Sequence, residues 1–206
     1  FLPEEVHGKE GVVMAFLYIG DEKSGQELIE PVRQFAEPYG EFTGMMPYKD
    51  WQQIFDPLLT PGARNYWKSH NFEILNDETI DVIIDYASKI PLTASEIFIA
   101  QMGGYTSRQP LNKTAYVHRK ANYIMNVHAR WDESSDDDLC IDWARAFFNS
   151  ATPYAMGGAY VNFMTEEEDA RVPSAYGENF ARLIDIKEKY DPENIFNLNQ
   201  NIKPTK

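Results

Sequence analysis

The sequence has a single cysteine, Cys140, among its 206 residues. One cysteine excludes an internal disulfide framework and any CxxC metal cluster. The sequence also lacks a long apolar run, which excludes a membrane-spanning helix. Basic residues are few: 19 Lys and Arg stand against 32 Asp and Glu, and the formal net charge is −13. Such a surface repels phosphate backbones and anionic lipid, so we expect binding neither to nucleic acid nor to membranes.

The beginning of the chain also lacks expected features. It reads Phe-Leu-Pro-Glu-Glu, without an initiator Met and without the charged and apolar regions of a signal peptide. We therefore expect the carboxy-terminal portion of a longer protein. We expect that protein to be soluble, and cytoplasmic rather than secreted.

The familiar catalytic and metal-binding motifs are missing from the sequence. There is no Walker loop, no GxGxxG after a strand, no HExxH pair and no GxSxG turn. Two acidic runs, 132–138 and 166–169, lack the order of an EF-hand loop, so we interpret them as a solvated loop and a charged helix start. The four histidines are scattered, and we predict no metal site. Cys140 lies in an apolar helical stretch and is predicted to belong to the core.

Hydrophobic periodicity predicts an α+β protein. Apolar residues have strand-like patterns at 12–19, 65–75, 95–102, 114–117, 122–131 and 159–163. They recur at helical spacing at 22–36, 48–55, 77–88, 136–149 and 173–190. We therefore expect an antiparallel or mixed sheet of five or six strands, covered by helices on one face.

The segment 122–131 has two different faces. Tyr123 and Met125 alternate with Asn126 and His128, which is the period-2 pattern of a strand. Histidine side chains exchange protons near neutral pH, so His128 is a candidate base, although a histidine on such a two-faced strand is more often a surface residue than a catalytic one. The sequence has twelve Tyr, twelve Phe and four Trp. These aromatic residues either line a flat hydrophobic ligand pocket or fill a sheet–helix interface.

Several stretches together carry a family resemblance. Ala159-Tyr160-Val161-Asn162-Phe163 precedes Lys189-Tyr190-Asp191-Pro192-Glu193-Asn194-Ile195-Phe196-Asn197-Leu198-Asn199-Gln200-Asn201-Ile202. Earlier stretches agree, at 64–69 (RNYWKS), 101–104 (QMGG) and 114–119 (TAYVHR). The combination resembles the berberine-bridge-enzyme-like FAD-linked oxidases of the vanillyl-alcohol oxidase and p-cresol methylhydroxylase flavoprotein superfamily.

The resemblance implies a two-part protein. An amino-terminal domain, absent from this chain, binds FAD, in some members covalently. Residues 1–163 are then a substrate-binding domain built on an antiparallel sheet, and residues 164–206 are a segment that returns to the FAD domain. The implied partners are a small-molecule substrate and the FAD domain of the same protein.

The resemblance also implies a reaction. Such a protein oxidises an alcohol or an activated C–H substrate by hydride transfer to the flavin, with dioxygen as acceptor and hydrogen peroxide as product. Two alternatives stay open. One is a non-catalytic ligand-binding or structural module that keeps the fold, and the other is a flavin dehydrogenase that uses a different acceptor.

The site residues follow from matching positions of the motifs. Tyr160 is a candidate base, and a strand over 159–163 would direct Tyr160 and Asn162 to one face. The sequence departs from plant members, because Phe163 replaces a second tyrosine and 123–126 offers no acid; the base is therefore Tyr160, His128 or a group upstream. The predicted cofactor contacts are Tyr160, Asn162, Asn199 and Gln200, and the predicted substrate contacts are Ala100, Met102, Tyr123 and Asn126.

Overall fold

The computed structural model describes residues 4–205, apart from the side chains of Glu5 and Glu166. The chain divides into two compact units, Phe1–Pro61 and Gly62–Lys206. Each unit is described by itself. The predicted boundary between residues 163 and 164 concerns a different division and stays a prediction.

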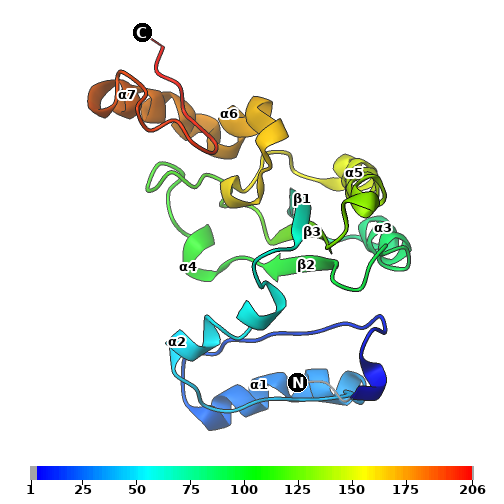
Figure 1. Cartoon of the computed structure of the whole chain (residues 1–206). Helices are drawn as coiled ribbons and strands as arrows, with labels where there is room; N and C mark the ends of the chain where they lie inside the picture. Colours follow the sequence, from blue (N-terminus) through cyan, green and yellow to red (C-terminus); the bar gives the residue numbers. More distant parts are fainter. Residues whose placement is uncertain (1–3, 206) are drawn as a thin grey trace. The chain divides into compact units, whose positions relative to one another are not determined.

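The first unit contains two α-helices, α1 (Glu22–Phe35) and α2 (Tyr48–Trp51), with single 3-10 turns at Glu4–Val6 and Asp56–Leu58 (Figure 1). The helix predicted over 22–36 is confirmed. Its first turn is capped by Asp21, whose carboxylate accepts a hydrogen bond of 2.9 Å from the backbone nitrogen of Ser24. The helix predicted over 48–55 is shorter than expected, because only its first turn is α-helical and tighter turns follow.

The strand predicted over 12–19 is wrong. The segment has no strand or bridge pairing, and its apolar side chains are exposed, Val12 to 91% and Ile19 to 90%. A strand exists only where a neighbouring strand accepts its backbone hydrogen bonds. Among the described residues no such partner lies along this segment.

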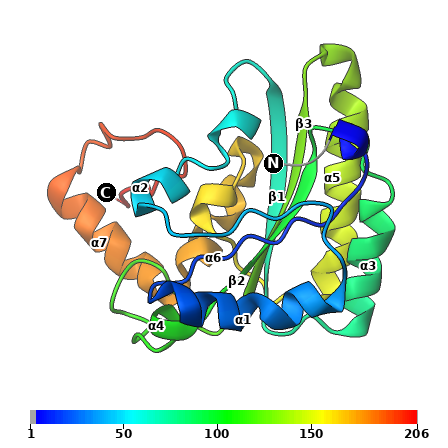
Figure 2. The ribbon, with the colours of Figure 1, turned by 90° about the horizontal axis from the view of Figure 1, so that it is seen from below.

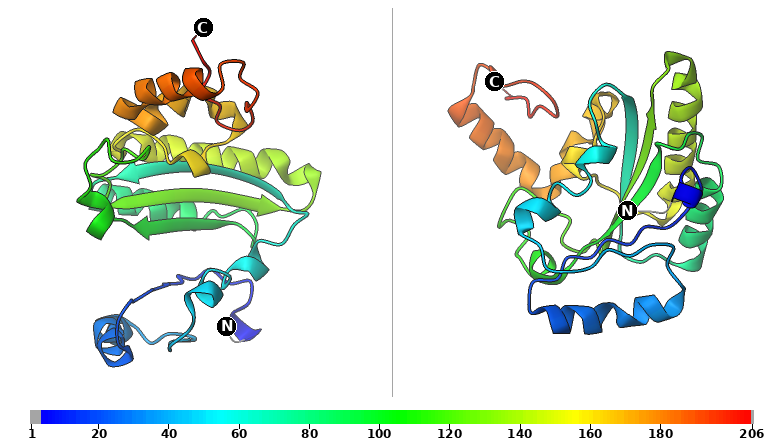
Figure 3. Two further views of the ribbon diagram at one scale, coloured as in Figure 1. Left: turned by 90° about the vertical axis from the view of Figure 1, so that its left-hand side faces the viewer. Right: turned by 60° about the horizontal axis from the view of Figure 1, so that its bottom comes forward.

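The second unit is built on a three-stranded antiparallel sheet. Its strands are β1 (Arg64–Phe72), β2 (Glu96–Gln101) and β3 (Tyr123–Trp131), in the order β1-β3-β2 (Figure 3). These three strands, their antiparallel pairing and the α+β class confirm the sequence prediction. The expected five or six strands are too many for the described chain.

Two further predicted strands are loops or turns in the structure. At 114–117 the backbone is irregular, and the carbonyl of Thr114 accepts a hydrogen bond of 3.1 Å from the amide of Asn179 instead of a strand partner. At 159–163 the chain forms a 3-10 turn, η5 (Val161–Phe163). The preceding Gly157 and Gly158 have φ values of 78° and 72°, which turn the chain out of an extended path.

Two helices cover one face of the sheet, as predicted. They are α3 (Asp77–Ala87) and α5 (Asp137–Ala151), and both lie on the same side of the strands (Figure 2). Asn76 caps α3 by accepting a hydrogen bond of 3.0 Å from the backbone nitrogen of Thr79. Cys140 is fully buried in this core, which confirms its predicted place. The other buried members of the core are Tyr66, Phe72, Met125, Val127, Ala129, Trp131, Trp143, Ala144, Phe147 and Ala151.

The opposite face of the sheet, called the distal face below, carries the alternate residues. The register places side chains of all three strands side by side there. Polar residues alternate with aromatic ones, in contrast to the apolar core face. The distal face comprises Asn65, Trp67, Ser69 and Asn71 of β1, Glu96, Phe98 and Ala100 of β2, and Ile124, Asn126, His128 and Arg130 of β3.

The helix predicted over 173–190 is interrupted. The chain forms α6 (Val172–Tyr176) and α7 (Phe180–Tyr190), separated by a 3-10 turn that begins at Gly177. Gly177 has a φ of 47°, which an α-helix does not accommodate. A short helix, α4 (Gly104–Ser107), follows β2. Together α6, the preceding turns and Ile202 of the tail enclose a second small core around Ala159, Met164, Val172 and Ala175.

Candidate functional site

A pocket of about 410 Å³ lies over the distal face, at the end where β2 leaves the sheet. Its wall combines strand residues with residues from the loops that follow β2 and precede β3, and from the η5 turn. Four of its nine residues are aromatic, which suits a flat ligand. The lining residues are Phe98, Ala100, Met102, Thr106, Tyr116, Arg119, Ile124, Tyr160 and Phe163.

Tyr160 lies in this wall among other rings. Its ring meets Phe163 edge to face at 5.1 Å and Tyr116 at 6.2 Å. The amide nitrogen of Asn162 donates a hydrogen bond of 2.9 Å to the Tyr160 hydroxyl oxygen. The strand that motivated this pairing is wrong, yet the 3-10 turn still brings the phenol and the amide together. A donor at the phenol oxygen stabilises negative charge there.

Two buried polar atoms of the pocket wall have no hydrogen-bond partner among the residues that the structure describes. They are the Tyr116 hydroxyl and the Arg119 Nε. The guanidinium of Arg119 lies 5.1 Å from the centre of the Tyr116 ring, and its other nitrogens bind Thr106 and Thr114. Burial raises the pKa of Tyr116, although the charge of Arg119 opposes that shift. Tyr116 is therefore a neutral hydroxyl at physiological pH.

The four predicted substrate contacts divide between the two faces of the sheet. Ala100 and Met102 line the pocket. Asn126 lies on the distal face beside Phe98 in the register, and its buried Oδ1 has no hydrogen-bond partner within the described range 4–205. Tyr123 lies on the other face, packed against the core under α3 and α5. Tyr123 and Asn126 therefore cannot contact one ligand from the same side.

His128 does not line the Tyr160 pocket. It stands four residues from Ile124 along β3, a distance of about 14 Å in an extended strand. Its Nε2 lies 2.9 Å from Asn65 Oδ1 and its Nδ1 lies 3.4 Å from Glu96 Oε1. The imidazole thus bridges the two neighbouring strands, so the structure separates the two candidate bases.

Neither of the predicted amide contacts of the tail lines the pocket. The side-chain amide of Gln200 donates a hydrogen bond of 3.0 Å to the carbonyl of Met164, next to Phe163. Asn199 is exposed, has a φ of 57° and accepts a hydrogen bond from the backbone of Asn201. The tail therefore supports the η5 turn from behind, and its contact with a cofactor stays a prediction.

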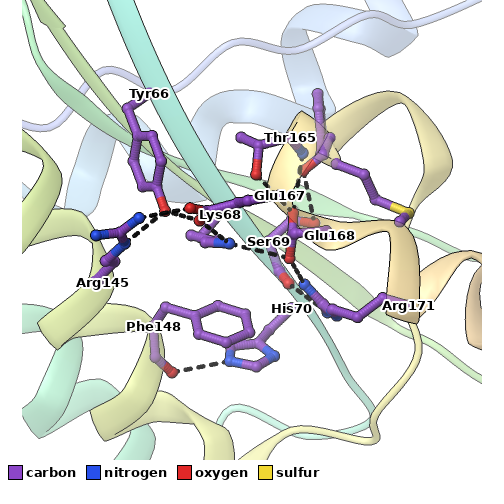
Figure 4. A network of polar contacts seen from close by, with 12 residues as sticks. Tyr66, Lys68, Ser69, His70, Arg145, Phe148, Thr165, Glu167, Glu168 and Arg171 are labelled. Atoms are coloured by element: carbon purple, nitrogen blue, oxygen red, sulfur yellow. Dashed lines mark hydrogen bonds and ion pairs between the residues drawn. The ribbon is translucent and has the colours of Figure 1, made fainter. Parts of the chain in front are cut away.

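A cluster of charged residues beside β1 was not predicted from the sequence (Figure 4). The acidic run 166–169 begins a 3-10 helix, η6 (Glu166–Arg171), and its Glu168 is buried rather than solvated. Lys68 Nζ lies 2.7 Å from Glu167 Oε1 and 3.3 Å from Glu168 Oε1. Arg145 and the Tyr66 hydroxyl also bind Glu167, and Arg171 binds Glu168. The spacing of Lys68 and Glu168 in the sequence gives no signal of this pairing.

The cluster shifts the titration of its members. Burial opposes the charge of Glu167, but hydrogen bonds from Lys68, Tyr66 and Arg145 outweigh it and lower the pKa to about 2. Burial likewise opposes the charge on Lys68, and Glu167 outweighs it and raises the pKa of the ammonium. Next to the cluster, His70 stacks on Phe148 at 4.0 Å, and burial lowers its pKa to about 4.

Other site classes find no support in the described part of the chain. Among residues 4–205 no group of three or more His, Cys, Asp or Glu side chains is placed to hold a metal ion. No described helix is both long and apolar enough to cross a membrane.

Known proteins share the sequence motifs and the fold. Residues 159–203, which contain the Tyr160 turn and the tail, match the model of the family described as "Berberine and berberine like". An FAD-linked oxidoreductase of Dictyostelium discoideum is 30% identical over 198 residues, covering 95% of this chain and 43% of that protein. Residues 159–203 thus carry the berberine-like domain, and the chain as a whole resembles the FAD-linked oxidoreductases. FAD is the cofactor that this family implies.

Two further relatives of this berberine-bridge-enzyme-like chain extend the comparison. Chitooligosaccharide oxidase of Gibberella zeae is 26% identical, covering 95% of this chain and 44% of that protein. The crystal structure of a carbohydrate oxidase from Microdochium nivale shares the fold with a TM-score of 0.68, at 22% identity over 92% of this chain and 45% of the other. The chain thus spans less than half the length of these relatives.

Proposed function

We propose that this chain forms the substrate-facing part of an FAD-dependent oxidoreductase that oxidises an alcohol or an activated C–H bond. The observation that carries the proposal is the pocket over the distal face, where the Tyr160 hydroxyl meets an aromatic wall. Ala100 and Met102, predicted as substrate contacts, line the same pocket. The names of the relatives, FAD-linked oxidoreductase and chitooligosaccharide oxidase, support the same class of reaction.

The distal face suits a flat ring with polar edges. Besides the aromatic wall, it carries two buried polar atoms that have no hydrogen-bond partner in the described part of the chain, namely Asn126 Oδ1 and Trp67 Nε1. We assign the edge of the flavin ring to the neighbourhood of Tyr160 and Asn162. The sequence has no glycine-rich phosphate loop, so the phosphates of FAD are assigned to an FAD-binding domain outside this chain.

The residues of this chain have a definite part in the reaction. Bound FAD supplies a ring that accepts a hydride from carbon. The step requires Tyr160 as the phenolate, whose oxygen accepts the proton of the substrate hydroxyl, and Asn162 holds that oxygen in place through its amide nitrogen. Phe163 and Phe98, which meet edge to face at 6.4 Å, exclude water from one side of the reacting carbon. We further propose dioxygen as the final acceptor, with hydrogen peroxide as product.

The experiment uses the full-length protein that contains this chain. We expect it to absorb at about 450 nm through bound flavin and to release hydrogen peroxide with a hydroxylated substrate. Because Phe cannot accept a proton, Tyr160→Phe is expected to lower the rate constant of flavin reduction about tenfold or more, measured by stopped-flow bleaching of the flavin band.

A matched control is Tyr154→Phe. This substitution also removes a phenol hydroxyl, but Tyr154 lies outside the pocket. It is expected to reduce flavin at the wild-type rate. A colourless full-length protein that also fails to bind added FAD contradicts the proposed function. An unchanged rate in Tyr160→Phe removes Tyr160 from the role of base.

A further inference from the structure

Tyr160 belongs to a loop that is closed by a single side chain. The Tyr160 loop, residues 158–171, begins at Gly158 and ends at Arg171. Arg171 Nη2 donates a hydrogen bond of 2.8 Å to the carbonyl oxygen of Gly158. This bond joins the two ends of the loop, and Tyr160 stands two residues from the closure.

Arg171 also ties the closed loop to the sheet. The same Nη2 lies 3.4 Å from the carbonyl oxygen of Ser69 in β1, and Nη1 binds Glu168 (Figure 4). The guanidinium carbon lies 5.0 Å from the centre of the Phe148 ring in α5. A planar guanidinium can hold several acceptors at once in fixed directions, which the single point charge of a lysine cannot do.

Glu168 makes the loop rigid from inside. It is 4% exposed, and its Oε2 accepts hydrogen bonds from the backbone nitrogen of Thr165 at 3.0 Å and from its hydroxyl at 3.3 Å. Its other oxygen faces Arg171 and Lys68. A buried carboxylate is stable only while its cationic partners stay in place, so the ion pair couples the loop conformation to β1.

The start and middle of the loop are also held. A Cβ on Gly158 would lie 2.3 Å from the His118 ring, and His118 Nε2 lies 3.0 Å from the carbonyl oxygen of Ala175. Ser69 Oγ lies 3.5 Å from the carbonyl oxygen of Phe163. The Tyr160 hydroxyl is therefore placed by contacts made to the backbone on either side of it, rather than by its own side chain alone.

We propose that Arg171 is a positioning residue for Tyr160: by joining Gly158, Ser69 and Glu168 it holds the Tyr160 loop against β1 and sets the place of the phenol over the distal face. The inference rests on the proposed function, because it gives Tyr160 a chemical role. Arg171 itself does not line the pocket. It acts on the reaction only through the backbone of the loop.

The test compares two conservative variants of the full-length, FAD-loaded protein. Arg171→Lys keeps the charge but cannot hold Glu168 and the Gly158 carbonyl in one plane. Arg145→Lys is the matched control, because Arg145 belongs to the same charged cluster but contacts only Tyr66 and Glu167. Two quantities are measured: backbone hydrogen exchange at residues 158–164, and the rate constant of flavin reduction at saturating substrate.

Arg171→Lys is expected to speed exchange at 158–164 about tenfold and to lower the rate constant of flavin reduction about tenfold, with a KM change of less than about threefold. Arg145→Lys is expected to leave both quantities within about twofold of wild type. Wild-type exchange in Arg171→Lys overturns the proposal. Faster exchange with an unchanged rate overturns the positioning role, and so does an equal rate loss in Arg145→Lys.

A milder variant covers the case in which Arg171→Lys does not fold. Ser69→Ala removes the hydroxyl beside the Phe163 carbonyl and keeps the strand. It is expected to speed exchange at 158–164 and to slow flavin reduction to a smaller extent, and wild-type values of both contradict the attachment of the loop to β1 on which the proposal rests. Failure of the proposed function is separate: the full-length protein is then colourless and fails to bind added FAD, while hydrogen exchange at 158–164 still reports on the closure by Arg171.

Discussion

Single residues in the second unit differ sharply in what their burial requires. Cys140 is fully buried and needs no partner, and the apolar spacing around it was sufficient to predict this. Lys68 and Glu168 are also buried, at 8% and 4% exposed, but carry charge, so each requires an opposite charge from a distant part of the chain. A single sequence contains no record of such pairs. The acidic runs therefore suggested a solvated loop and a charged helix start, although Glu168 is buried.

His70 gives a prediction at the scale of one side chain. Its pKa is lowered by burial to about 4, from an ordinary value of 6.5. Between these values the unfolded chain binds a proton that the folded chain excludes, so stability is complete above pH 6.5 and falls as the pH drops toward 4. We expect His70 to account for a loss of about 2 kcal/mol between pH 7 and pH 5.

The measurement is urea unfolding of the chain at both pH values, with His70→Gln for comparison. The variant should lose less stability than the wild-type chain over this interval. The pKa of His118 is also lowered by burial, so some pH dependence persists in the variant. Glu167 adds little here, because its pKa moves from 4.5 to about 2 and acts mainly below this interval. Equal pH dependence in the two proteins contradicts the assignment to His70.

At the scale of elements, the sequence predicted the helices and strands whose apolar residues recur with one clear period. Strands β1, β2 and β3 and helices α1, α3 and α5 were all predicted near their observed bounds. The turn at 159–163 was not, because its β-branched and aromatic residues favour a strand while two preceding glycines with positive φ redirect the chain. The same turn still joins Asn162 to Tyr160. The two side chains therefore lie together as predicted, although the predicted strand is wrong.

The two glycines before this turn give a prediction for the element. Gly157 and Gly158 have similar φ values of 78° and 72°, but a Cβ on Gly157 meets no atom within 4 Å, whereas one on Gly158 meets the His118 ring. Gly157→Ala is expected to cost about 1 kcal/mol of unfolding free energy, from backbone strain alone. Gly158→Ala is expected to cost about 1–3 kcal/mol more, from overpacking.

Chemical denaturation of the two variants measures this difference. Gly157→Ala serves as the control for backbone strain, since alanine at either position has the same unfavourable positive φ. Equal losses in the two variants would falsify the close contact with His118.

At the scale of the whole chain, the two units are unequal in what holds them together. In the described residues of Phe1–Pro61 no side chain is fully buried, and α1 has no buried residue along its 14 positions. An isolated helix of this length is marginal in water, because most helical stability comes from tertiary packing. The strand predicted over 12–19 is wrong for a related reason, because a strand also depends on contacts with other elements. Local pattern predicted the segment, but pairing depends on neighbours that local pattern does not specify.

Hydrogen exchange over the whole 206-residue chain should show this inequality directly. Backbone amides of 22–35 are expected to exchange at least about 100-fold faster than those of β3, which lies between two strands and is covered by α5. Protection of 22–35 comparable to that of β3 would show that the helix has tertiary support that its exposed surface does not indicate.

The strand order β1-β3-β2 leaves the sheet with two borders of different character. The border along β1 is occupied by the Tyr160 loop, which contacts that strand through Lys68 and Ser69. The border along β2 has no further strand among the described residues, and Phe98 and Ile99 on it are 45% and 38% exposed. Such a border is a template for adding another strand, from the same chain or from a second molecule. In concentrated solution, we therefore expect molecules of this chain to associate through β2. A charged residue introduced on β2 is expected to reduce this aggregation.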